Sequence, residues 1–131
     1  FRFSDKNGRT HTLHGIEAPM TLLFFSNPGC TACMDIINAL KSSPQVTSSI
    51  ASGKLAVLNI YIDEDLKAWR EYMPIYPLEW YNCYDPDYVI RTDVLYNVRA
   101  IPSLYILDKD KNVIMKDAPE ERLFDWITKS L

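Results

Sequence analysis

Residues 21–40 read TLLFFSNPGCTACMDIINAL, and their pattern predicts the central elements of the structure. Its first part is continuously apolar over residues 22–25, which is typical of a strand that is covered on both faces. Turn-forming residues follow at 27–29. Apolar residues then recur at helical spacing, at Ile36, Ile37 and Leu40. The sequence therefore predicts a buried strand, a sharp turn and a helix.

Two cysteines, Cys30 and Cys33, fall at the start of this helix. Unpaired backbone N–H groups and the positive end of the helix dipole stabilise a thiolate there. Only the thiolate attacks a disulfide, so we expect Cys30 to be a redox nucleophile and the more buried Cys33 to resolve the mixed disulfide. An inert structural disulfide is the alternative, although a bond between residues so close in sequence closes almost no loop and stabilises little.

The rest of the sequence offers the cysteine pair no metal partners. The two histidines, His11 and His14, are three residues apart, and on a strand they would point to opposite faces. Met34 stands where a haem-attachment motif needs histidine. We therefore predict no metal and no cofactor.

Composition narrows the class of protein. The chain has 131 residues, of which 47% are hydrophobic and 24% charged, as in a globular protein with a single core. A net charge of −3 gives no basic surface for nucleic acid, and no apolar run approaches the roughly 18–20 residues that span a bilayer. We expect one domain over residues 1–131, with a hairpin at about 1–14. Because the sequence opens on Phe1 without a signal peptide, it is interpreted as a mature form or as a domain excised from a longer exported protein, and we favour the second.

The remaining elements follow from local patterns. Asn7-Gly8 predicts a hairpin turn. Ser43-Pro44 predicts the start of a helix, and that helix should end at Gly53. Further strands are expected at 54–62, 80–84, 103–107 and 113–115, and further helices near 63–73, 89–96 and 119–131. The charges at 108–111 are read as a solvated turn. This order, with buried central strands, predicts a three-layer α/β/α domain around a mixed sheet.

Three segments carry a resemblance to a known family: the Cys30–Cys33 stretch, residues 98–108 (VRAIPSLYILD) and residues 1–10 (FRFSDKNGRT). They resemble the thioredoxin superfamily, and within it the TlpA/ResA-like thiol–disulfide oxidoreductases of the bacterial cell envelope and the thioredoxin-like proteins of Bacteroidetes. The resemblance spans nearly the whole chain. It implies a thioredoxin-like fold with an N-terminal hairpin extension.

The resemblance also implies a substrate-binding segment. Pro102 would be a cis-proline beside Cys30, and Ile101 would offer its N–H and C=O groups to an extended peptide. Pro28 and Thr31 are the other substrate-binding candidates. Position alone favours the alternative, an ordinary trans proline that opens a strand.

Departures from the family pattern occur around the first cysteine. Phe24 stands six residues before Cys30, where typical thioredoxins carry an aspartate that assists proton transfer from the second cysteine. Pro28-Gly29 replace the usual aromatic residue, and Thr31-Ala32 match none of the familiar dipeptides. The lone Cys83 is read as a buried core residue, with a third redox thiol as the alternative.

Two functions remain as hypotheses. The first is a thiol–disulfide oxidoreductase, leaning to reductase, that exchanges electrons with protein or peptide thiols and disulfides and with an upstream electron donor. It would work in the cell envelope or periplasm, with a lipid anchor in a preceding segment as one option. The second is a non-catalytic binding module of the same fold with a vestigial cysteine pair.

Overall fold

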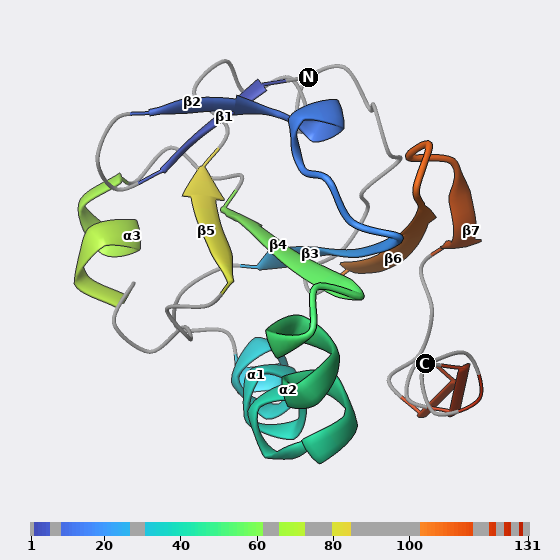
Figure 1. The fold of residues 1–131 in the computed structure, drawn as a ribbon. Helices are drawn as coiled ribbons and strands as arrows, with labels where there is room; N and C mark the ends of the chain where they lie inside the picture. Colours follow the sequence, from blue (N-terminus) through green and yellow to red (C-terminus); the bar gives the residue numbers. More distant parts are fainter. Residues whose placement is uncertain are drawn as a thin grey trace.

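The computed structural model describes residues 2–5, 9–26, 31–61, 66–72, 80–84, 103–116, 121–122, 125–126 and 129. These residues form an α/β fold around one mixed sheet, as predicted, with the strand order β2-β1-β5-β4-β3-β6-β7 (Figure 1). The strands are β1 (Arg2–Asp5), β2 (Thr10–Thr12), β3 (Met20–Ser26), β4 (Leu55–Tyr61), β5 (Tyr81–Tyr84), β6 (Ser103–Asp108) and β7 (Val113–Lys116). The helices with described bounds are α1 (Thr31–Ser42), α2 (Pro44–Ala51) and α3 (Leu66–Tyr72), with a 3-10 turn η1 (Leu13–Gly15). The described residues 121, 122, 125, 126 and 129 are also helical.

The three central strands, β3, β4 and β5, run parallel, so their carboxyl ends meet at one edge of the sheet. Strand β6 is antiparallel to β3, and β7 returns antiparallel to β6. The predicted N-terminal hairpin is confirmed, since β1 pairs with β2 in the register Arg2↔Thr12 and also adds to the edge of β5. Its expected turn at 7–8 lies outside the described residues.

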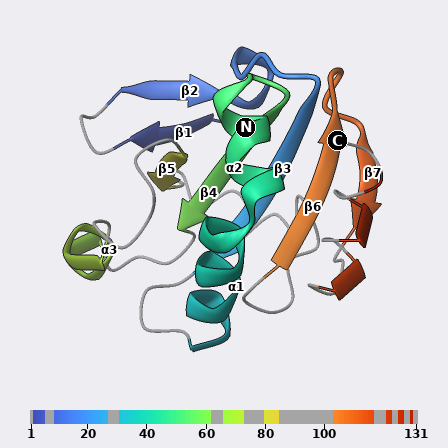
Figure 2. The same ribbon diagram turned by 60° about the horizontal axis from the view of Figure 1, so that its bottom comes forward.

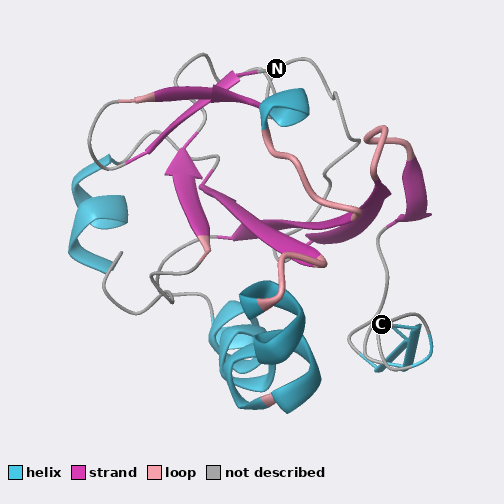
Figure 3. Cartoon of the chain, in the orientation of Figure 1, coloured by secondary structure: helices cyan, strands magenta, loops and turns pink. Residues whose placement is uncertain are grey.

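Strand alternation divides the core into two layers. On β3, Leu22 and Phe24 face one way and Leu23 and Phe25 the other, and all four are fully buried. Helices α1 and α2 cover the first face (Figures 2 and 3). The second face packs against η1 and the segment that follows it, through side chains that include Leu13 and Ile16. The continuous apolar run in the sequence reflects this burial on both sides.

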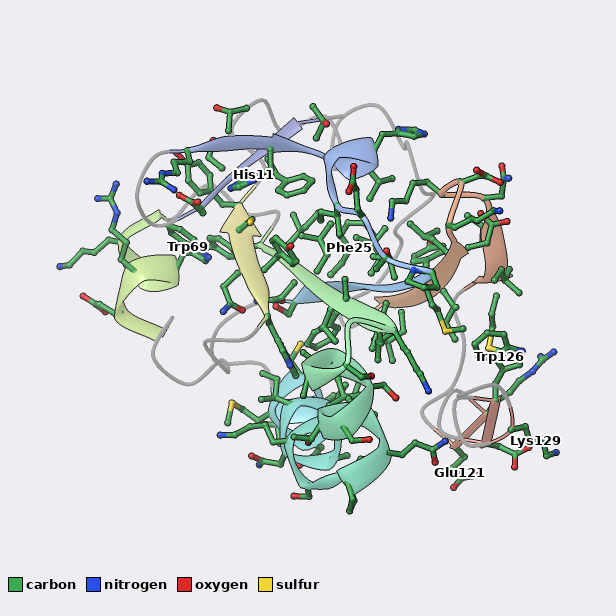
Figure 4. The ribbon with its side chains drawn as sticks, in the orientation of Figure 1. His11, Phe25, Trp69, Glu121, Trp126 and Lys129 are labelled. Carbon is green, nitrogen blue, oxygen red and sulfur yellow. The ribbon has the colours of Figure 1, made fainter. Side chains whose placement is uncertain are left out.

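Helix α3 covers the same face as α1 and α2. Its Trp69, labelled in Figure 4, is 2% exposed. The Trp69 ring packs on Tyr84 of β5, with ring centroids 4.8 Å apart. Tyr84 points away from its neighbour Cys83, whose side chain lies in the opposite layer. Trp69 and Tyr84 thus pack helix α3 against the sheet, whereas Tyr81 of the same strand is exposed. None of the described helices has the length and apolar content needed to cross a bilayer. The helix expected at 89–96 falls outside the described residues.

The start of α2 is a local signal that the structure confirms. The Ser43 hydroxyl accepts a hydrogen bond from the backbone N–H of Val46 at 3.3 Å, and Pro44 occupies the first turn. Gly53, just beyond the helix, has a φ of 79°, a conformation that favours glycine.

Replacing Ser43 by alanine should lower the free energy of unfolding by about 1 kcal/mol, because an N–H of the first turn loses its cap. Urea denaturation measures the change. Ser42→Ala is the matched control, since Ser42 is an exposed residue at the end of α1 and caps nothing. Equal midpoints for the two variants would contradict the capping role.

In the turn between β6 and β7, the prediction that all the charged residues at 108–111 are solvated is wrong for one residue. Lys111, expected in a solvated turn, is only 8% exposed, and its Nζ donates a hydrogen bond to the buried Thr21 Oγ1 at 2.9 Å. Burial lowers the pKa of the Lys111 amine, and the negative charge of Asp108 partly offsets that effect. Lys111 has a φ of 67°, which costs a residue with a Cβ about 1 kcal/mol. The partner, 90 positions away in sequence, explains why a lysine occupies this position.

Candidate functional site

The candidate site is built at the N-terminal end of α1, at the carboxyl edge of the parallel strands. Strand β3 ends at Ser26 and α1 begins at Thr31, so the helix starts beside the edge where open α/β sheets commonly bind ligands. The first turn of α1 contains no acidic residue, and Lys41 lies in its last turn. The positive end of the helix dipole is therefore not neutralised from within that turn.

Cys33 is held on the inner side of α1. Its side chain is 1% exposed and belongs to the same buried cluster as Leu22 and Phe24. Thr31 and Ala32, in the same turn, are exposed. The helix is fixed in this rotation by Ile36, Ile37 and Leu40, which follow Cys33 on the buried face, as the sequence pattern predicted. The structure therefore places the Cys33 side chain in the core, directly behind an exposed helix end.

The other predicted site residues lie outside the described residues: Cys30, Pro28, Ile101 and Pro102. The structure does describe Ser103, the residue that follows Ile101 and Pro102 in the chain. Ser103, the first residue of β6, pairs with Phe25 near the carboxyl end of β3. The segment that follows Pro102 thus starts at the same edge of the sheet as α1.

A buried polar pair at this edge was missed by the sequence analysis. Ser26, the last residue of β3, and Asn59 of β4 are both 0% exposed, and the Ser26 hydroxyl donates a hydrogen bond to Asn59 Oδ1 at 2.5 Å. Asn59 stands beside Phe24 in the parallel register of the two strands. The available signal was a lone amide inside the apolar run of β4, between Leu58 and Ile60.

Cys83 belongs to the other layer of the molecule. It is a free thiol with a fully buried side chain, packed among residues of the face opposite Cys33. Burial, and secondly the negative charge of Asp5, raises the pKa of Cys83 to about 12. A thiol that stays protonated at neutral pH is a poor nucleophile, so the structure supports the prediction of a core residue.

Comparisons with known proteins agree with this arrangement. Residues 19–113 match the Thioredoxin-like family. A thioredoxin-like protein from Bacteroides caccae is 38% identical, with a TM-score of 0.96 over the whole chain, and the chain covers 47% of that protein. The C-terminal domain of an uncharacterized protein from Bacteroides fragilis is 42% identical, with a TM-score of 0.93, covering 98% of this chain and 91% of that one.

A more distant structure is a putative thiol-disulfide oxidoreductase from Bacteroides vulgatus, 19% identical with a TM-score of 0.81, covering 100% of this chain and 92% of that one; it shares the fold. Nothing among the curated proteins matches the chain significantly. The family match covers most of the sequence, and its residues 19–113 contain β3, the cysteine-bearing helix and β6. The chain belongs to the Thioredoxin-like family.

Proposed function

We propose that the protein is a thiol–disulfide oxidoreductase that reduces protein or peptide disulfides through Cys30 and Cys33. Cys30 attacks the substrate disulfide, and Cys33 resolves the mixed disulfide that forms. Ile101, Pro102, Pro28 and Thr31 contribute to binding of the substrate chain. An upstream donor returns the pair to its dithiol form.

One observation carries the proposal: Cys33 is buried on the inner side of the first turn of α1, three residues after Cys30, at the carboxyl edge of the parallel strands. The exposed Thr31 and Ala32 leave the outer side of that turn open to a partner. The proposed compartment is the bacterial cell envelope, which follows the family resemblance of the sequence. The direction of electron flow follows the family resemblance, and a reduction potential measured against glutathione tests it.

Replacing Cys33 by serine should trap the covalent intermediate. Cys30 still attacks a disulfide, but no second thiol releases the product, so a mixed disulfide with insulin or a disulfide-bonded peptide should accumulate. Non-reducing electrophoresis and mass spectrometry detect the adduct. The double variant Cys30→Ser, Cys33→Ser is the matched control and should trap nothing. Normal turnover by Cys33→Ser, or no adduct with any disulfide, would instead favour a binding module without redox activity.

A further inference from the structure

The strongest unexplained feature is the Asn59 amide. Its side chain is 0% exposed, and its Oδ1 accepts the hydrogen bond from Ser26. Its Nδ2, equally buried, has no hydrogen-bond partner among the residues that the structure describes. A buried N–H group without a partner destabilises a fold by about 1–3 kcal/mol, whereas an apolar residue would fit the surrounding strand without that loss. Folding alone gives no reason for an amide here.

The position of Asn59 in the sheet suggests a function for its amide group. It is on the face of the sheet that α1 covers, beside Phe24, and Phe24 and Cys33 share one buried cluster. Of the buried polar side chains on the described parts of β3 and β4, Ser26 and Asn59 face α1, whereas Thr21 faces the opposite layer. No carboxylate is buried anywhere in the described ranges. The buried polar groups that β3 and β4 place on the face covered by α1 are therefore a hydroxyl and an amide, and the amide nitrogen makes no hydrogen bond to Cys33 in the structure.

We propose that Asn59 is a positioning residue for Cys33: its free Nδ2–H group stabilises the Cys33 thiolate by a hydrogen bond during disulfide exchange, and Ser26 fixes the orientation of the amide. This inference rests on the proposed function. A hydrogen bond to the charged form of a group favours that form, and the effect is larger where water is excluded. The amide thus supports the thiolate at the edge of an apolar cluster, where an ion is otherwise unfavourable.

Resolution of the mixed disulfide by Cys33 can be written with atoms and electrons balanced and without a buried acid. In the mixed disulfide, the Cys30 sulfur is bonded to a substrate sulfur. The Cys33 thiol loses its proton and its sulfur attacks Cys30, so that the Cys30–Cys33 bond forms and the Cys30–substrate bond breaks. The electron pair leaves with the substrate sulfur, which takes up the proton that Cys33 released. The two cysteines are oxidised and the substrate disulfide is reduced. Asn59 gains and loses no proton.

Asn59→Leu tests the role directly, because it keeps the volume and removes the donor. The two half-reactions are measured separately by stopped flow with a fluorescent disulfide peptide. Formation of the mixed disulfide, followed in the Cys33→Ser background, should be unchanged by Asn59→Leu. Its resolution, followed with Cys33 present as release of the reduced peptide, should slow by roughly 10- to 100-fold, as expected for loss of a hydrogen bond to a charged group. Ser49→Ala is the matched control, since it removes a buried hydroxyl from α2, outside strands β3 and β4, and should leave resolution unchanged.

Asn59→Asp gives a readout that a purely structural role would not affect. It replaces a neutral donor by an ionisable group of the same shape, so the pH profile of the resolution step should gain a second ionisation. Ser26→Ala keeps the amide but frees its orientation, and should slow resolution less than Asn59→Leu does. These two variants decide the question if Asn59→Leu fails to fold.

The outcomes separate the two proposals. No mixed disulfide in any background would overturn the proposed function. A mixed disulfide that forms normally and resolves at the original rate in Asn59→Leu would overturn the role of Asn59 alone. An unchanged pH profile in Asn59→Asp would do the same.

Discussion

Replacing Cys30 by serine should abolish disulfide exchange, with a loss of at least roughly 1,000-fold in the rate of insulin reduction. The reason is chemical. Exchange requires a sulfur nucleophile that is partly ionised near neutral pH, and a serine hydroxyl is neither ionised there nor able to form a disulfide. Turbidity of insulin in dithiothreitol measures the rate, and the variant should match the reagent alone.

The matched control is Cys83→Ala, which removes a thiol from the layer opposite Cys33. It should retain turnover, because the Cys83 thiol is buried and stays protonated at the pH of the assay. Circular dichroism and urea denaturation of both variants show whether each is folded. If Cys30→Ser reduced insulin at the original rate, the cysteine pair would not be the source of the activity. If instead Cys83→Ala lost turnover, the core interpretation of Cys83 would be wrong.

Local signals predicted the central part of the fold. The apolar run in β3 and the helical spacing of Ile36, Ile37 and Leu40 are properties of neighbouring residues, and the structure confirms both. The same holds for the cap at Ser43. The sequence also predicts a buried Cys33, and the structure places it on the face that Ile36, Ile37 and Leu40 bury. These features need no knowledge of the partner strands.

The features that sequence analysis missed depend on pairing across the sheet. The Ser26–Asn59 bond joins positions 33 residues apart, and it exists only because β3 and β4 are parallel neighbours. The buried position of Lys111 depends on Thr21 in the same way. A charged residue in a turn ordinarily faces solvent, so only the tertiary structure could show this exception. Within the described residues, the helix and the burial of Cys33 were thus predictable from the sequence, and the polar pair on β3 and β4 was not.

Cys83 should make the stability of the folded protein strongly dependent on pH in the alkaline range. Burial and the charge of Asp5 raise the pKa of Cys83 from 9.0 to about 12 in the folded state. Above pH 9 the unfolded chain releases the thiol proton while the folded chain keeps it, so ionisation favours the unfolded state. The contribution of the neutral Cys83 thiol to the free energy of unfolding is complete below pH 9. It falls by about 1.4 kcal/mol per pH unit until roughly pH 12. Over that window the loss amounts to roughly 4 kcal/mol, which is a large part of the 5–15 kcal/mol typical of a domain.

Urea denaturation of the reduced protein at pH 8, 9, 10 and 10.5, compared with Cys83→Ala, isolates this effect. The variant loses packing at every pH, which lowers its free energy of unfolding by a constant amount. Lysines and tyrosines titrate in both chains, so their contributions cancel in the difference. The difference in free energy of unfolding between the two proteins should therefore be constant up to about pH 9. At higher pH this difference should shrink, because only the original chain loses stability through the ionisation of Cys83. A gap that stays constant to pH 10.5 would mean that the thiol ionises in the folded state, and hence that its environment admits charge or water.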